Sequence, residues 1–187
     1  MSSKEKQTLV IFSNNLLLEQ LFAHHLSPFI EQPLDLIIDA PWGYAFEAKK
    51  RPNSHSLILS DNPCGEYIED LWDLKPTVLI TRPTTLADFC LFAQKASQGQ
   101  KYKLANDYQS PLNTTERKVL RLCALQHHPK NIAEKLQLSQ GSIKNTLSAI
   151  YQKLNLNGMT ALGFYYFGGL ELQAFKNTKG DSSHKNI

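Results

Sequence analysis

The stretch LSQGSIKNTLSAIYQKL, residues 138–154, predicts a tight turn followed by an amphipathic helix. Apolar side chains recur in it at helical spacing and predict one buried face: Ile143, Leu147, Ile150, Tyr151 and Leu154. Polar side chains recur at the same period on another face: Lys144, Asn145, Ser148 and Gln152. A helix that exposes amide, hydroxyl and ammonium groups can lie in the major groove of DNA. This segment therefore predicts a DNA-binding helix.

The residues before this stretch predict two more helices. Asn113 and Glu116 have the spacing of a capping box, and they would begin a helix that ends near Gln126. Pro129 suits the first turn of a short second helix that buries Ile132, Ala133 and Leu136. After a turn at Gln137 and Leu138, Ser139 caps the third helix and leaves free N–H groups where a phosphate could bind. The second and third helices then form a helix-turn-helix.

Residues 112–156 resemble the helix-turn-helix domain of the LuxR/FixJ/NarL family. The positions that match the family pattern by identity are Leu112, Glu116, Val119, Leu120, Ile132, Ala133, Leu136, Ser139, Lys144, Ile150, Lys153 and Leu154. The resemblance implies a four-helix DNA-binding domain over residues 112–173. It also implies that the DNA contacts come from Ser139, Gln140, Lys144, Asn145, Ser148 and Lys153. For Lys153 the alternative is that it covers the end of the helix.

The distribution of charge agrees with this interpretation. Residues 110–173 contain seven Lys or Arg and three Asp or Glu, whereas residues 1–109 contain ten Lys or Arg and thirteen Asp or Glu. A basic region is the electrostatic requirement for binding phosphates. The excess is modest, so we expect salt-sensitive binding by two copies of the domain.

The stretch that follows, residues 159–175, is apolar and aromatic but too short and too rich in Gly to span a membrane. In the resembled family the fourth helix forms the dimer contact on DNA. We therefore predict a homodimer that associates through Phe164, Tyr165, Phe167 and Leu170. The alternative is that these side chains pack against the N-terminal half. We expect residues 174–187, which are polar and charged, to be disordered.

The N-terminal half, residues 1–104, predicts an α/β domain, joined to the DNA reader by a linker at 105–111. Apolar strands at 8–12, 34–38, 57–60 and 77–81 alternate with helices at 15–26, 67–74 and 86–97. Continuous apolar strands separated by helices indicate a parallel sheet that is covered on both faces. The order resembles the receiver domain of response regulators, shortened by one strand–helix unit.

A receiver that accepts phosphate needs carboxylates at its strand ends to hold Mg²⁺. Here Ser13-Asn14 follows the first strand, and Asp61 follows the third as the candidate phosphoacceptor or, alternatively, as a turn residue. We therefore expect an atypical receiver that works without phosphorylation. It would hold two copies of the chain together, or bind a small ligand or a regulatory protein. Thr81-Arg82 matches part of a cyclic di-GMP motif of some relatives but lacks its Trp.

Composition sets the remaining expectations. The three cysteines have no paired spacing, so we expect neither zinc nor disulfides, and no cofactor or catalytic motif is visible. The first residues do not form an apolar signal segment, and we expect a cytoplasmic protein that is not an enzyme. The sequence predicts a transcriptional regulator that binds double-stranded DNA. The alternatives are a response regulator phosphorylated on Asp61 and a partner-binding regulator without specific DNA binding.

Overall fold

The computed structural model of the protein describes residues 8–48, 51, 54–82 and 84–169, and these form two compact units. The first, which we call the α/β unit, contains the chain up to Asp61 together with Leu71–Asp107. The second, which we call the helical unit, contains Asn62–Asp70 and the chain from Tyr108 onward. The short segment Asn62–Asp70 thus belongs to the helical unit although it lies in the N-terminal half of the sequence.

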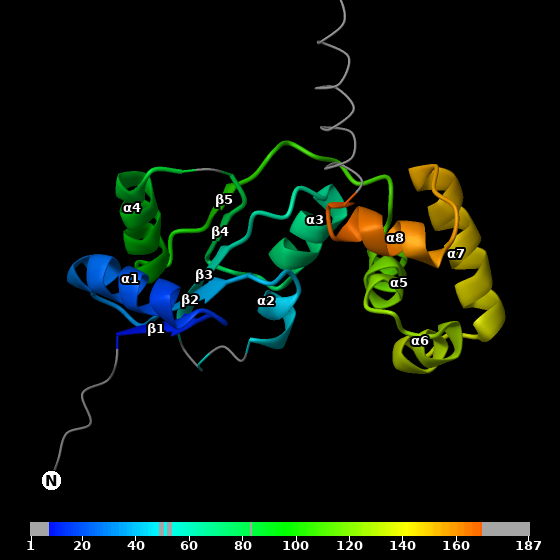
Figure 1. Ribbon diagram of the computed structural model, residues 1–187, viewed down its shortest axis with the longest axis horizontal. Helices are drawn as coiled ribbons and strands as arrows, with labels where there is room; N and C mark the ends of the chain where they lie inside the picture. Colours follow the sequence, from blue (N-terminus) through cyan, green and yellow to red (C-terminus); the bar gives the residue numbers. More distant parts are fainter. Residues whose placement is uncertain (1–7, 49–50, 52–53, 83, 170–187) are drawn as a thin grey trace, which may run out of the picture. The chain divides into compact units, whose positions relative to one another are not determined.

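The α/β unit is built on a five-stranded parallel sheet whose strands follow the order of the sequence (Figure 1). The strands are β1 Leu9–Phe12, β2 Leu34–Ile38, β3 His55–Leu59, β4 Val78–Ile80 and β5 Tyr102–Leu104. All neighbouring strands pair in parallel. Every residue of β2 is buried, which is typical of an inner strand in a sheet covered on both faces.

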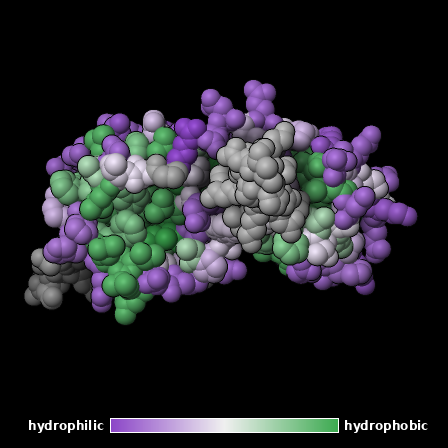
Figure 2. All heavy atoms as spheres, turned by 45° about the horizontal axis from the view of Figure 1, so that its top comes forward, coloured by the Kyte–Doolittle hydropathy of each residue, from purple (hydrophilic) through white to green (hydrophobic). Residues whose placement is uncertain are grey.

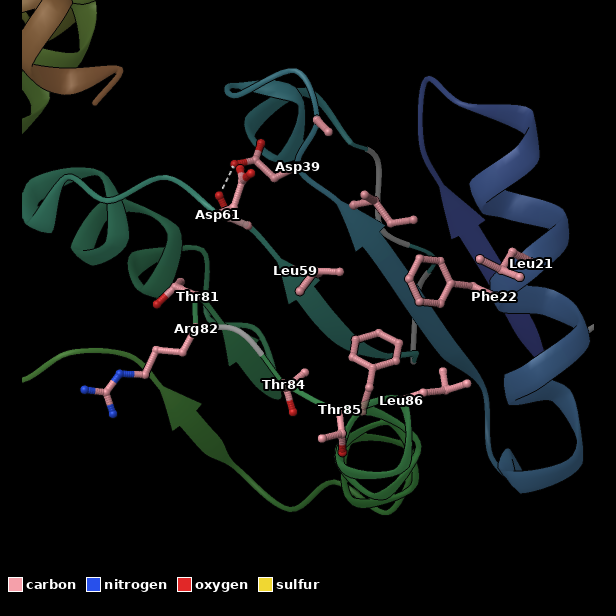
Figure 3. Close-up of a pocket in the computed structure, with 14 residues that line it drawn as sticks. Leu21, Phe22, Asp39, Leu59, Asp61, Thr81, Arg82, Thr84, Thr85 and Leu86 are labelled. Atoms are coloured by element: carbon pink, nitrogen blue, oxygen red, sulfur yellow. Dashed lines mark hydrogen bonds between the residues drawn. The ribbon is translucent and has the colours of Figure 1, made fainter. Parts of the chain in front are cut away.

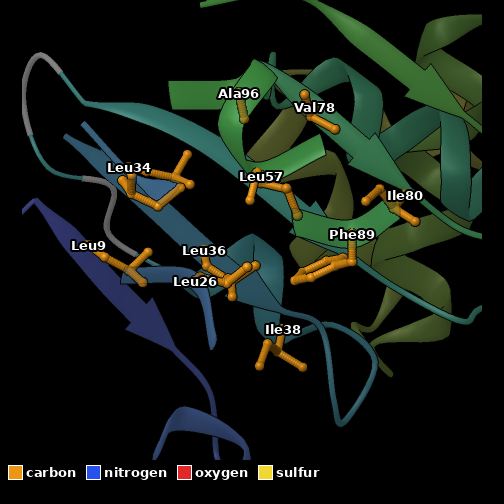
Figure 4. Close-up of a cluster of buried hydrophobic side chains, with 12 residues drawn as sticks. Leu9, Leu26, Leu34, Leu36, Ile38, Leu57, Val78, Ile80, Phe89 and Ala96 are labelled. Carbon is orange, nitrogen blue, oxygen red and sulfur yellow. The ribbon is translucent and has the colours of Figure 1, made fainter. Parts of the chain in front are cut away.

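Helices α1 (Leu16–Leu26) and α4 (Leu86–Ser97) cover one face of this sheet. The alternation of side chains along β2 turns Leu34, Leu36 and Ile38 toward these helices, where Leu26 and Phe89 complete the core (Figure 4). The remaining helical elements of the unit are a turn of 3-10 helix at Ser27–Phe29 and the short α2, Tyr44–Glu47. The apolar strand patterns therefore specify this core.

The side chain of Asp35 in β2 is fully buried and is compensated by neighbouring polar groups. Its carboxylate pairs with Arg51 Nε at 2.6 Å and accepts hydrogen bonds from the Arg51 backbone N–H and the Ser54 hydroxyl, both at 2.7 Å. A buried carboxylate is stable only when its oxygens are paired in this way. Asp35 is therefore a structural residue.

The helical unit contains α5 Thr114–Ala124, α6 Pro129–Leu136, α7 Gln140–Leu154 and α8 Met159–Tyr166. The expected capping box of Asn113 and Glu116 is present, and Pro129 occupies the first turn of α6. Gln137 ends α6 in the left-handed conformation (φ 55°), and Ser139 caps α7. The helix-turn-helix expected at 129–154 is confirmed.

The fold class expected from the sequence is confirmed, but β5 and α2 were missed. β5 has only three residues, and its Tyr102 is exposed, so it lacks the continuous apolar run of the other strands. The expectation that one strand–helix unit is missing is therefore wrong for the strand, because β5 is present as the fifth strand of the sheet. Between β5 and α5 the chain forms no helix. No helix within the described ranges is long and apolar enough to cross a membrane.

Candidate nucleic-acid interface

Helix α7 has one buried face and one exposed face, as its sequence predicts. Ile143, Leu147 and Ile150 are buried. The exposed side chains lie at intervals of four residues, with Asn145 beside them: Gln140, Lys144, Ser148 and Gln152. Among the described residues, no side chain binds the Lys144 ammonium group or the Asn145 amide, whereas the Ser148 hydroxyl donates to the Lys144 carbonyl at 3.1 Å. The structure therefore presents a row of hydrogen-bonding side chains to the outside of the unit.

The first turn of α7 is capped from within. Ser139 Oγ accepts a hydrogen bond from the Ser142 backbone N–H at 3.0 Å and lies 2.8 Å from the Ser142 hydroxyl. The backbone N–H groups of Gln140 and Gly141 precede the first N–H that a helix can pair internally. These N–H groups give the N-terminal end of the helix a partial positive charge, which suits an anion. The exposed Lys144 follows one turn later in the same helix.

Lys153 has a partner inside the unit. Its Nζ lies 2.8 Å from both carboxylate oxygens of Glu116, which also accepts a hydrogen bond from the Asn113 backbone N–H at 2.8 Å. Burial by itself would raise the pKa of Glu116, but the hydrogen bonds from Lys153 and Asn113 outweigh it, and the pKa is lowered. Lys153 thus joins the C-terminal end of α7 to the start of α5, which agrees with the helix-end role considered for it from the sequence.

Asp70 is a buried acid of the helical unit that the sequence did not single out. It lies in α3, Gly65–Asp73, whose first residues belong to this unit. Its carboxylate accepts a hydrogen bond from the Tyr166 hydroxyl at 2.7 Å and pairs with Arg117 at 3.4 Å and Arg121 at 3.8 Å. Burial raises the pKa of Asp70 against the opposing effects of Tyr166 and the two arginines. Two basic residues of α5 are therefore engaged inside the unit.

Glu66 lies one turn earlier in α3 and is also fully buried. It accepts hydrogen bonds from the hydroxyls of Tyr108, Tyr165 and Ser110. Burial, followed by the hydrogen bond to Glu66, raises the pKa of Tyr108 and of Tyr165, so both hydroxyls remain donors. Next to Glu66, a Cβ on Gly65 would clash with the Tyr108 ring, and only Gly allows this approach.

The aromatic residues of α8 divide into different environments. Tyr166 is buried against Tyr67, with ring centroids 5.0 Å apart, and Tyr165 binds Glu66. Phe164 is 54% exposed and, together with Phe167, lines a hollow of about 330 Å³. Leu170, the fourth residue expected to support dimerisation, lies outside the described residues, as does the tail at 174–187.

At the carboxyl edge of the sheet, acids follow β2 and β3 but not β1. After β1, Ser13 and Asn15 form the start of α1. Asp39 is 1% exposed and accepts hydrogen bonds from the Ala45 backbone N–H at 2.9 Å and the Ser60 hydroxyl at 2.8 Å. Asp61 is exposed and accepts from Trp42 Nε1 at 2.6 Å. Within the described ranges, no cluster of three or more His, Cys, Asp or Glu side chains could hold a metal ion.

Asp39 is a polar residue at this edge that the sequence analysis missed. The receiver resemblance predicts that the acids follow the first strand. The sheet instead places the end of β2 beside the end of β3. A single Asp after a buried strand is also common in turns, so the sequence offers no signal that singles it out.

Comparison with known proteins finds a family match for the helical part of the chain. Residues 110–165 match the GerE profile, described as bacterial regulatory proteins of the luxR family. The chain is 44% identical over 52 residues to the "Uncharacterized transcriptional regulatory protein YvfU" of Bacillus subtilis strain 168. That match covers 28% of this chain and 26% of the relative, so the chain spans about a quarter of that protein.

Solved structures resemble a larger part of the chain. RcsB from Salmonella enterica serovar Typhimurium, bound to the promoter rprA in the presence of BeF3−, has a TM-score of 0.51 at 16% identity. The likeness covers 84% of this chain and 96% of that one. A complex of two RcsB dimers on two parallel DNAs has a TM-score of 0.49 at 16% identity and covers 86% of this chain and 97% of that one. The first likeness shows the receiver-like and helical fold, and residues 110–165 are a helix-turn-helix domain of the luxR family.

Proposed function

We propose that the protein is a transcriptional regulator that binds specific DNA sequences as a homodimer and does so without phosphorylation. The observation that carries this proposal is the exposed row on α7, in which the side chains of Lys144 and Asn145 have no hydrogen-bond partner among the described residues. The family of residues 110–165 and the name of the Bacillus relative support it. So does the solved structure of RcsB bound to the promoter rprA.

The chemistry of the row suits base recognition in the major groove. A Lys ammonium can donate to guanine O6 and N7 or to a phosphate, and an Asn amide pairs with adenine N6 and N7. We assign these roles to Lys144 and Asn145. Ser148 and Gln140 lie one turn away on either side of Lys144, where they extend the contact. Ser139 holds the first turn of α7, whose free N–H groups would bind a backbone phosphate. Lys153, which is engaged by Glu116, would contact phosphate only by sharing its ammonium group.

Independence from phosphorylation is proposed from the edge of the sheet. Mg²⁺ prefers carboxylate oxygens, but Ser13 and Asn14 follow β1, and the Asp39 carboxylate is occupied by backbone and hydroxyl donors. Asp61 remains the candidate acceptor for the alternative function. Labelling of the protein by acetyl phosphate that is abolished in Asp61→Asn would establish that alternative. We place the homodimer contact on Phe164 of α8 and on Phe167, which directly follows the helix, since Phe164 is exposed beside a hollow.

The DNA proposal is tested by selecting duplexes from a random library with the purified full chain. Affinity is then measured by fluorescence anisotropy over a salt series. We expect an enriched inverted repeat. Lys144→Ala should weaken binding about tenfold and reduce the salt slope by about 0.9, the value for one lost phosphate contact. If Lys144 instead binds guanine, affinity should fall mainly for duplexes with the preferred base. Asn145→Ala should reduce the preference for the enriched sequence over a scrambled duplex.

The control is Lys101→Ala, which makes the same charge change at an exposed residue of the α/β unit. It should leave the affinity and the salt slope unchanged. No enriched sequence, or equal loss in Lys101→Ala and Lys144→Ala, would contradict the proposal. A chain that binds no specific DNA would favour the partner-binding regulator, with the exposed Phe164 as the first residue to test.

A further inference from the structure

The α/β unit contains a cavity of about 610 Å³ at the carboxyl edge of its sheet. It opens where β2, β3 and β4 end, between α1 and the start of α4 (Figure 3). In open α/β sheets, ligands bind at this edge of the strands. The volume lies within the range of small-molecule sites. The DNA-binding row on α7 belongs to the other unit, so this cavity is a separate site.

The wall of the cavity is mainly apolar. Phe22 and Phe89 meet in it with ring centroids 5.0 Å apart, and Leu59 adds a side chain from the end of β3. Leu21 and Leu86 stand at the rim and remain 47% and 50% exposed. Figure 2 shows apolar side chains gathered over this unit on the side of α1 and α4. Apolar side chains around a hollow lose contact with water when an apolar molecule fills it, and this favours binding.

The charged groups lie on one side of the cavity wall, and they differ in how many of their polar atoms already form hydrogen bonds with the protein. Asp39 is buried, and its two oxygens already accept hydrogen bonds. The Arg82 guanidinium donates to Asn106 at 2.7 Å, and its side chain turns away from the cavity (Figure 3). Asp61 is exposed and uses Oδ1 for Trp42, while no hydrogen bond joins its Oδ2 to any of the described residues. The charge available to a ligand is therefore that of the Asp61 carboxylate.

We propose that this cavity binds a small amphipathic cation, with an apolar body against Phe22, Phe89 and Leu59 and a protonated amine at Asp61. The carboxylate accepts the hydrogen bonds of an ammonium group, and such a charge-assisted bond is stronger than one to a neutral donor. An anionic molecule of the same shape is repelled. Trp42, through its bond to Asp61, reports on the occupied site.

The test uses three probes that share one naphthylmethyl body and differ in the charge of the group attached to it: 1-naphthylmethylamine, 1-naphthalenemethanol and 1-naphthaleneacetate. They are titrated into the full chain to millimolar concentration, because molecules of this size bind weakly. Binding is followed by calorimetry and, in a Trp72→Phe background, by the fluorescence of Trp42. We expect the amine to bind at least tenfold more tightly than the acetate, with the alcohol between them.

Three variants separate the contribution of charge from that of shape. Asp61→Asn keeps an acceptor for Trp42, and it should weaken the amine to the level of the alcohol while leaving the alcohol unchanged. Leu86→Ala trims the rim of the cavity and should weaken all three probes severalfold. Its control, Leu91→Ala, trims a leucine of the same helix that is 47% exposed outside this cavity, and it should change nothing. Equal binding of amine and acetate, an unchanged amine affinity in Asp61→Asn, or loss that is equal in Leu86→Ala and Leu91→Ala would overturn the proposal.

Discussion

At the scale of single residues, Asp70 is a buried acid that joins two helices of the helical unit. It is 2% exposed and is bound by Arg117, Arg121 and Tyr166. Asp70→Asn keeps the shape of the side chain but removes the negative charge that it presents to two partly buried guanidinium groups. Breaking a buried ion pair by removing one partner typically costs 3–5 kcal/mol, and partial exposure of the arginines reduces this to about 2–3 kcal/mol.

That loss is measured as faster hydrogen exchange of the α5 and α8 amides in the full chain. The control is Glu134→Gln, which removes an exposed acid of α6 and should change the local stability by less than about 0.5 kcal/mol. Equal protection of α5 in the wild type and Asp70→Asn would show that the pairing contributes nothing to stability.

Glu116 predicts how the helical unit responds to acid. Its pKa is lowered below the usual 4.5, so its unfolded-state pKa is the higher of the two. The stability it contributes is therefore present above about pH 4.5 and is lost as pH falls through the folded-state pKa. Glu116→Gln keeps an oxygen for the Asn113 N–H but loses the attraction to Lys153.

We expect thermal unfolding, followed by circular dichroism from pH 3 to 7, to show a lower midpoint for Glu116→Gln near neutral pH. The gap to the wild type should narrow as the pH falls through the folded-state pKa of Glu116, because the folded chain then also binds the proton. A gap of constant size at every pH would assign the effect to packing and not to the charge.

At the scale of elements, the first turn of α7 depends on Ser139. Its Oγ accepts the Ser142 N–H, which otherwise has no acceptor inside the helix. Ser139→Ala should destabilise the helical unit by about 1 kcal/mol, the usual cost of a lost N-cap. Thermal unfolding measures this, with Ser148→Ala on the exposed face of the same helix as the control. If the two variants unfold together, the cap does not limit stability.

The elements of the helical unit could be predicted because their signals are local. Asn113 and Glu116 are three residues apart, and the apolar positions of α7 repeat every three or four residues, so the sequence displays both. β5 is short and partly exposed, and it therefore gives no such pattern. The hydrogen bonds of Glu66 to Tyr108 and Tyr165 join residues 42 and 99 positions apart. No periodicity connects such residues, and the folded chain alone brings them together.

At the scale of the whole molecule, the two compact units do not correspond to two continuous stretches of sequence. The first part of α3 belongs to the helical unit, and its end belongs to the α/β unit. The predicted linker 105–111 is likewise shared, with Ala105–Asp107 in one unit and the rest in the other. The acids Glu66 and Asp70 thus lie with the basic part of the chain, where they bind residues of α5 and α8. The helical unit takes part of its buried polar structure from the N-terminal half.

A fragment of residues 105–187 tests this dependence because it lacks Asn62–Asp70. In the full chain, Arg117→Gln removes a partner of Asp70 and should cost about 1–2 kcal/mol of local stability in α5. In the fragment the same substitution should cost almost nothing, since Asp70 is absent, and the fragment itself should exchange its α5 amides faster than the full chain. Hydrogen exchange is measured on the full chain and the fragment, each with and without Arg117→Gln. The difference between the two costs is the coupling energy between Arg117 and the segment Asn62–Asp70. An equal cost of Arg117→Gln in the fragment and the full chain, with equal protection of α5, would show that residues 108–169 form the helical unit without help from α3. The opposite result would mean that Glu66 and Asp70 belong with any excised form of the DNA-binding domain.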